Sequence, residues 1–258
     1  MKKLLIIFAM LLLSVNAEAS IKTVNVEYKQ GDTTLQGYLA WDDATKVTRP
    51  GVLIVHEWTG LNEHMKQRAE MLAKLGYVAF AADIYGKGIR PSAQSEAAKT
   101  AGIYKNDRPL MRARVRAGLE ELRKQKHVDP QRIAAIGYCF GGTTVLELAR
   151  DAADIRGVVS FHGGLSTPTP GDAANIKGKV LALHGADDPF VKADEVAAFQ
   201  EEMRNGGVDW QFISYSNAVH SFTNKAAGND NSKGAAYNEK ADRRSWDAMK
   251  SFFAEIFK

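Results

Sequence analysis

The chain has 258 residues, of which 45% are hydrophobic, so it is long enough to bury the core of one α/β domain. The formal net charge is only +4 and the basic residues are spread along the chain, which excludes the concentrated positive patch of a nucleic-acid-binding protein. The single cysteine excludes an internal disulfide.

The first nineteen residues have the pattern of a secretory signal peptide. A basic start at Lys2 and Lys3 precedes an uninterrupted apolar run over residues 4–13 and a small-x-small cleavage pattern over residues 17–19. The apolar run is too short to span a membrane. We therefore expect cleavage after residue 19, a mature domain over residues 20–258 and a location in a bacterial periplasm. An uncleaved anchor is the alternative.

Strands and helices are expected to alternate after this segment. Residues 23–41 predict an antiparallel hairpin, because apolar and polar side chains alternate on both sides of a turn at residues 30–32. Further strands are predicted over residues 51–56, 77–82, 133–138, 157–161, 178–184 and 210–215. Helices are predicted over residues 62–75, 92–104, 107–126, 141–152, 193–205 and 240–257.

This alternation predicts an α/β fold with a mostly parallel, twisted sheet, helices on both faces and the antiparallel hairpin at one edge. Nothing in the sequence marks a second domain or an internal repeat. In such sheets ligands bind at the carboxyl ends of the strands, so polar residues that follow strands are the candidates for a site. These residues are His56, Glu57, Asp83, Cys139, His162, Asp187, Asp188 and His220.

The stretch around the only cysteine, Cys139, has the layout of a nucleophile elbow. An apolar run ends in Gly137-x-Cys139-x-Gly141, and a helix start rich in small residues follows. Glycines two positions before and after the central residue let the backbone pass closely where a Cβ would clash. The alternative interpretation is a buried structural cysteine beside a glycine-rich turn.

Three residues follow the order nucleophile, acid, histidine that α/β-hydrolase triads use, namely Cys139, Asp188 and His220. The cysteine stands on the strand-to-helix turn, the acid follows a later strand, and the histidine lies between the last strand and the last helix. On these grounds alone Asp187 is a nearly equal alternative to Asp188, although a turn role suits Asp187.

Five motifs occur together in the chain: His56-Glu57-Trp58-Thr59-Gly60-Leu61-Asn62, Ala82-Asp83-Ile84-Tyr85, Gly137-Tyr138-Cys139-Phe140-Gly141-Gly142, His184-Gly185-Ala186-Asp187-Asp188-Pro189-Phe190-Val191 and His220-Ser221-Phe222. With them, roughly residues 24–257 resemble the dienelactone hydrolase (carboxymethylenebutenolidase) family of the α/β-hydrolase superfamily. A glutamate after the early strand, combined with a cysteine elbow, distinguishes this family from ordinary serine hydrolases.

The resemblance implies a role for each member of the triad. Cys139 is the nucleophile, and His220 takes its proton or stabilises the thiolate and later activates water. Asp188, which directly precedes the Pro-Phe-Val step, holds the imidazole in its useful tautomer. The oxyanion hole is expected to consist of the backbone N–H groups of Trp58 and Phe140.

The resemblance also gives Glu57 a role that a simple hydrolase does not need. In the family this glutamate pairs with the resting cysteine and releases it when substrate binds, so the thiolate forms only on demand. We expect Glu57 to keep Cys139 protonated at rest and less open to oxidants. The alternatives for Glu57 are capping of the following helix or a pair with a lysine.

Four further residues are candidates for substrate binding: Tyr85, Lys87, His162 and Asn224. Dienelactone-cleaving members hold the substrate carboxylate with arginines, and the matching positions here carry Lys87 and Asn224. A lysine keeps the charge without the bidentate fork and an asparagine keeps neither, so dienelactone itself is in question as a substrate. Arg90 and Lys225 are alternative cations. For His162 a packing role is equally expected.

The remaining histidines have structural interpretations. His56 and His184 end buried strands and are expected to be hydrogen-bonded core residues, whereas His64 and His127 have the pattern of solvated helix residues. The histidines show no metal-ligand spacing, so the sequence predicts no metal and no cofactor.

The expected function is hydrolysis of a small-molecule ester or lactone through an acyl-cysteine. The protein is expected to act as a monomer, with no nucleic-acid partner and, after signal cleavage, no association with a membrane. An esterase or thioesterase with no lactone preference uses the same residues and is the first alternative. A periplasmic binding or redox protein that keeps the fold without turnover is the second alternative, although such a protein has no need of a complete triad.

Overall fold

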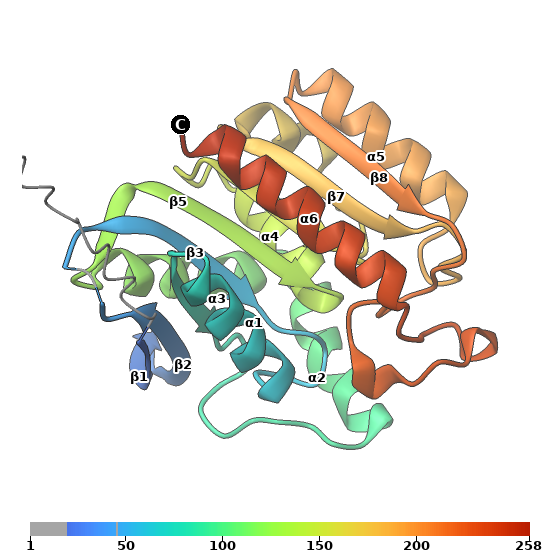
Figure 1. Ribbon diagram of the computed structural model, residues 1–258. Coiled ribbons are helices and arrows are strands. Elements are labelled where there is room, and N and C mark those ends of the chain that lie inside the picture. Colours follow the sequence, from blue (N-terminus) through green and yellow to red (C-terminus); the bar gives the residue numbers. More distant parts are fainter. Residues whose placement is uncertain (1–19, 45) are drawn as a thin grey trace, which may run out of the picture.

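One sheet organises the part of the chain that this computed structural model describes, residues 20–44 and 46–258 (Figure 1). Its eight strands are β1 (Ile21–Gln30), β2 (Thr33–Asp42), β3 (Arg49–Val55), β4 (Val78–Ala82), β5 (Val128–Tyr138), β6 (Gly157–Phe161), β7 (Lys179–Gly185) and β8 (Trp210–Tyr215). They lie in the order β1-β2-β4-β3-β5-β6-β7-β8. The predicted signal peptide falls outside the described residues.

The first two strands form the predicted hairpin. β1 and β2 pair antiparallel around Gly31, whose φ of +55° favours glycine at the turn. β2 also pairs antiparallel with β4, and the other neighbouring pairs of this sheet are parallel. The predicted fold class, a mostly parallel sheet with an N-terminal antiparallel hairpin, is therefore confirmed.

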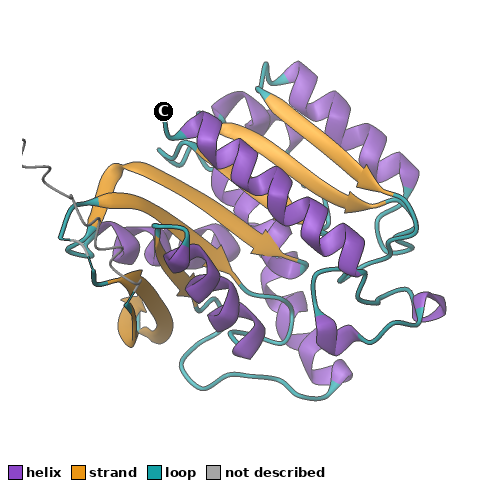
Figure 2. Cartoon of the chain, in the orientation of Figure 1, coloured by secondary structure: helices purple, strands orange, loops and turns teal. Residues whose placement is uncertain are grey.

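Helices cover both faces of the sheet (Figure 2). They are α1 (Glu63–Lys74), α2 (Gln94–Asn106), α3 (Arg108–Arg123), α4 (Phe140–Arg150), α5 (Ala193–Asn205) and α6 (Glu239–Ile256), with 3-10 turns η1 (Pro170–Asn175), η2 (Lys225–Ala227) and η3 (Asn231–Lys233). α1 and α6 pack on one face, around residues such as Ile54, and α2 to α5 pack on the other, around residues such as Leu53. Adjacent strand residues point to opposite faces, which is why these two neighbours belong to different cores.

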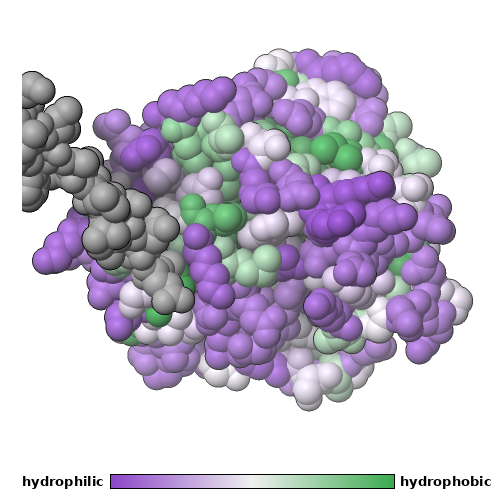
Figure 3. All heavy atoms as spheres, in the orientation of Figure 1, coloured by the Kyte–Doolittle hydropathy of each residue, from purple (hydrophilic) through white to green (hydrophobic). Residues whose placement is uncertain are grey.

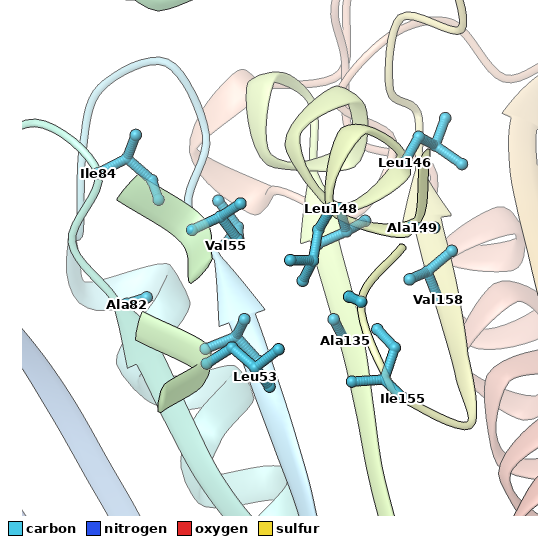
Figure 4. Packing of buried hydrophobic residues seen from close by; sticks show 14 of the residues in the cluster. Leu53, Val55, Ala82, Ile84, Ala135, Leu146, Leu148, Ala149, Ile155 and Val158 are labelled. Carbon is cyan, nitrogen blue, oxygen red and sulfur yellow. The ribbon is translucent and has the colours of Figure 1, made fainter. Parts of the chain in front are cut away.

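The core beneath α4 supports the end of β5, where the elbow lies. Figure 4 shows Leu53, Val55 and Ala135 of the sheet beside Leu148 of α4, and all four side chains are fully buried. Because protein interiors are packed as densely as organic crystals, this contact fixes the helix against β3 and β5.

Side-chain caps set the starts of α1 and α3. Asn62 accepts a hydrogen bond from the Met65 N–H at 3.3 Å, and Asp107 accepts one from the Leu110 N–H at 2.9 Å. Such caps satisfy N–H groups that have no partner inside the helix. The position of α1 matters for function because this helix follows directly on the loop that carries Glu57 and Trp58.

β5 begins earlier than the predicted residue 133. Its first residues, Val128 and Asp129, pair with Arg49 and Pro50 of β3, and the register shifts between Pro50 and Gly51. The polar residues at this point lack the apolar periodicity that marks a strand, so only the pairing with β3 reveals the extension.

On the face seen in Figure 3, hydrophilic residues predominate. Within residues 20–44 and 46–258, no helix combines the length and the apolar character that crossing a bilayer requires.

Candidate active site

Cys139 lies on a strained turn between β5 and α4. Its φ of 53° and ψ of −113° are unusual for a residue with a side chain. A Cβ on Gly137 would stand 1.9 Å from the Gly141 carbonyl oxygen, and a Cβ on Gly141 would stand 2.2 Å from that of Val55. The sequence spacing Gly-x-Cys-x-Gly is thus required by close backbone contacts on both sides of the thiol.

The side chain of Cys139 is only half-buried, unlike a core thiol. Its sulfur lies close enough to His220, in the loop between β8 and α6, to raise the pKa of that imidazole. The His220 Nδ1 is 2.8 Å from Asp188 Oδ2, and the other oxygen of this carboxylate accepts the Phe190 N–H at 2.9 Å. The structure therefore brings the three candidate triad residues together.

The choice between the two neighbouring aspartates follows from their contacts. Asp188 is 6% exposed and contacts His220, whereas the exposed Asp187 accepts a hydrogen bond from the Asn217 backbone at 3.0 Å. Asp187 thus holds a turn, and Asp188 is the acid within reach of the imidazole.

The electrostatic environment of His220 favours its charged form. Burial alone would lower the pKa of His220, but the charge and hydrogen bond of the Cys139 sulfur and the Asp188 carboxylate together raise this pKa to about 10. An imidazolium that persists at neutral pH stabilises a neighbouring thiolate, which is the reactive form of cysteine.

His162 lies directly beneath the elbow and is fully buried, which favours the packing role that the sequence analysis gave as its alternative. The Cys139 backbone N–H donates to the Phe161 carbonyl at 3.0 Å and also to His162 Nδ1 at 3.2 Å. The proton must then be on Nε2, which donates to the Thr223 hydroxyl at 2.8 Å. Burial, followed by the charge of His220, lowers the pKa of His162 well below its usual value. His162 is a neutral link between the elbow and the His220 loop.

Glu57 follows β3 and is almost completely buried, with 3% of its surface exposed. Its Oε2 accepts a hydrogen bond from the Asn224 amide at 2.6 Å and lies 3.4 Å from His64 Nδ1. Glu57 thus neither caps α1 nor pairs with a lysine in this arrangement. Here the carboxylate is held by Asn224 and His64, while the sulfur of Cys139 is held by His220, which differs from the resting Glu–Cys pair implied by the resemblance.

The prediction that His64 is a solvated residue was wrong. Its side chain is 14% exposed, and its Nε2 accepts a hydrogen bond from Arg68 Nε at 3.2 Å. The imidazole proton is therefore on Nδ1, facing Glu57. His64 belongs to the support of the Glu57 carboxylate.

Arg68 was missed by the sequence analysis. This buried guanidinium binds Asp242 at 2.6 Å and the Thr223 carbonyl at 2.9 Å, in addition to His64. Arg68 thereby joins α1 to the His220 loop and to α6. One signal was available, because Arg68 falls on the apolar stripe of α1 beside Met65, a position where an unpaired charge is costly.

The loop that carries Trp58 is fixed from two sides. His56, fully buried, accepts the Ile84 N–H at 3.1 Å through Nε2, so its Nδ1 carries the proton and donates to the Glu57 carbonyl at 2.7 Å. Tyr85 donates its hydroxyl to the Trp58 carbonyl at 3.0 Å. His56 is thus the hydrogen-bonded core histidine that was predicted. Tyr85 supports the loop, and its side chain is nearly buried.

The two expected oxyanion donors are the backbone N–H groups of Trp58, in the loop after β3, and of Phe140, at the start of α4. Phe140 is the first residue of α4, so its N–H is one of the donors that a helix leaves unpaired at its start. The ring of Phe140 stacks on His56 at a centroid distance of 5.9 Å, which places the start of α4 beside the Trp58 loop.

The remaining candidate, Lys87, lies away from this cluster. Its Nζ forms an ion pair with Glu27 on β1, and its backbone N–H donates to Thr34 of the hairpin. In this structure the charge of Lys87 is therefore paired with Glu27 at the edge of the sheet. In the part of the chain that the structure describes, no cluster of three His, Cys, Asp or Glu residues suits a metal ion.

Comparison with known proteins settles the family. The family model described as "Dienelactone hydrolase family" matches residues 35–257. The chain belongs to this family. Its members are hydrolases of ester or lactone bonds, so this chain is a hydrolase of that class.

Solved structures agree with this assignment. The protein m3DLH is 43% identical, with 92% of this chain and 99% of that chain covered and a TM-score of 0.89. The dienelactone hydrolase-like promiscuous phosphotriesterase P91 from metagenomic libraries is 42% identical, with 93% and 100% covered and a TM-score of 0.88. Among the curated relatives compared by sequence, "Protein usf" of Aquifex pyrophilus is 28% identical over 89% of this chain and 97% of its own length. The α/β-hydrolase fold is therefore shared over nearly the whole chain.

Proposed function

We propose that this dienelactone hydrolase family member cleaves small esters or lactones through a covalent acyl-cysteine, with Cys139, His220 and Asp188 as its triad. The observation that carries the proposal is the contact series from the half-buried sulfur on its strained turn, through His220, to Asp188 at 2.8 Å. A binding protein would gain nothing from holding a thiol this way.

In the first half of the proposed reaction, the Cys139 thiolate attacks the carbonyl carbon of the substrate. The backbone N–H groups of Trp58 and Phe140 stabilise the resulting oxyanion. When the tetrahedral intermediate collapses, the bond to the leaving oxygen breaks, and His220 donates its proton to that oxygen. The acyl group is then attached to the sulfur as a thioester.

In the second half, His220 is neutral and takes a proton from water, which attacks the thioester carbonyl. The thiolate leaves, the acid product forms, and His220 again carries the proton. Asp188 keeps the Nδ1 of His220 protonated throughout, so the Nε2 is the atom that exchanges protons with the reactants.

The test uses p-nitrophenyl acetate and a panel of small lactones. We expect Cys139→Ala and His220→Ala to lose about 10³-fold or more of the activity. Mass spectrometry of the protein quenched during turnover should show an acyl group on Cys139. Equal rates for the wild type and both variants would contradict the triad assignment. Thioesters added to the same panel test the alternative that the protein is a general esterase or thioesterase.

A second candidate activity is hydrolysis of phosphotriesters. The 42% identity to P91, described as a promiscuous phosphotriesterase, favours it. Including a phosphotriester such as paraoxon in the same assay, with Cys139→Ala as control, tests whether this chain shares that activity.

A further inference from the structure

We infer that the site is built for uncharged esters and lactones and discriminates against substrates that carry a carboxylate. This inference rests on the proposed function and adds to it the class of substrate. It follows from the charged side chains beside the triad, where Glu57 is a buried carboxylate without a cationic partner and the arginines are bound by other groups.

The buried carboxylate is that of Glu57, one residue before the oxyanion-loop residue Trp58. Its two partners, the Asn224 amide and the neutral His64 imidazole, donate hydrogen bonds but bring no positive charge. In a poorly solvated site, a charge that lacks a counter-ion acts strongly on other charges. A second carboxylate placed on a substrate beside Glu57 would be repelled.

The cations on the same side of the molecule are already bound. Arg90 donates to the Leu61 and Ile89 carbonyls, both at 2.7 Å, and its guanidinium faces Asp83 at 3.5 Å. Arg68 is paired with Asp242. Releasing either guanidinium to a substrate would leave a buried carbonyl or carboxylate without its partner, which is costly.

Two lysines near the site also fail to offer a clamp. Lys225 lies over the ring of Tyr237, with its Nζ 5.8 Å from the ring centroid. Lys192 lines a cavity of about 450 Å³ that also carries Asp194 and Glu195, so its charge is offset there. Glu202 lines the cavity as well, so its lining has three acidic residues against one lysine.

Phe190, which lines this cavity, also contacts the triad histidine. The exposed Phe190 ring stands edge-on to His220 at 5.5 Å, and the cavity is further lined by Leu165, Pro170 and Phe199. Apolar walls next to the catalytic imidazole suit an alkyl or aryl portion of an ester. The arrangement thus accepts apolar groups and repels anions.

The test compares two esters of equal acyl length, p-nitrophenyl hexanoate and mono-p-nitrophenyl adipate. The acyl chain ends in a methyl group in the first and in a carboxylate in the second. Rates are corrected for hydrolysis without enzyme. We expect the wild type to prefer the hexanoate by about tenfold or more in kcat/KM. Equal or reversed preference would overturn the inference while leaving the proposed function intact. Failure to turn over either ester, with Cys139 unacylated, would overturn the proposed function.

A variant gives an independent measurement. Asn224→Arg places a guanidinium beside Glu57 and is expected to narrow the hexanoate-to-adipate ratio by about tenfold, because the ratio cancels any general loss of activity. Asn224→Gln keeps a neutral amide and serves as the matched control, for which we expect the wild-type ratio. An unchanged ratio in Asn224→Arg, with Tm near that of the wild type, would contradict the role given to charge.

Discussion

His162 and His220 lie side by side, with ring centroids 5.3 Å apart, yet their environments push their charges in opposite directions. His162 contacts a backbone N–H and a hydroxyl, and its pKa is lowered well below the usual value. His220 contacts a carboxylate and a sulfur, and its pKa is raised to about 10. Burial acts in the same direction on both rings, so the anionic partners of His220 make the difference.

In the proposed mechanism, this contrast separates a ring that moves protons from a ring that holds structure. Two imidazolium ions at this distance would repel each other, and a neutral His162 avoids that cost. It also keeps Nδ1 of His162 free to accept the Cys139 N–H, which a protonated ring could not do. The fixed neutral ring thus supports both the elbow and the loop of the charged ring.

The largest effect is expected from removing the anion that charges His220. Asp188→Asn should lower kcat by about 10³–10⁴-fold, because the amide no longer stabilises the imidazolium and can favour the wrong tautomer. Asp187→Asn, at the neighbouring exposed turn, is the control and should keep most of the activity. Steady-state kinetics of both variants checks this, and comparable losses in the two would contradict the assignment.

A smaller effect is expected from cutting the link between His162 and the His220 loop. Thr223→Val removes the hydroxyl that accepts the His162 proton and should lower kcat by about tenfold with little change in KM, because the buried Nε2–H loses its partner. Thr223→Ser keeps the hydroxyl and should restore kcat. The pH profile of Cys139 alkylation by iodoacetamide separates positioning from general destabilisation, since a purely structural role would shift only Tm.

The smallest effect is expected in the dependence of stability on pH. The pKa of His220 is raised from 6.5 to about 10 on folding, so its stabilising contribution is complete below pH 6.5 and is lost as the pH rises through about 10. His220→Gln should therefore lower the free energy of unfolding by about 1.5–3 kcal/mol at pH 6 and by less at pH 10. Urea denaturation at both values measures this. A constant difference between the two proteins would show that His220 is not charged in the folded state.

The hairpin, the alternation of strands and helices, and the glycine spacing around Cys139 were predictable because each depends on residues close in sequence. The triad order Cys139, Asp188, His220 could also be predicted from the sequence, because the fold places the carboxyl ends of parallel strands at one edge of the sheet. The start of β5 was not, because polar residues there become a strand only through pairing with Arg49 and Pro50.

The sequence by itself determined that a thiol stands on a tight turn. Gly137 and Gly141 have no Cβ, and the backbone around them leaves no room for one. Only the tertiary structure decided what surrounds that thiol. Arg68 and Thr223, 155 positions apart, meet in one hydrogen bond, and through them the supports of Glu57 and of His162 become connected. Which polar groups a buried side chain finds within about 3 Å is set by packing between distant elements. That is why the charges of His162 and His220 could be assigned only from the folded protein.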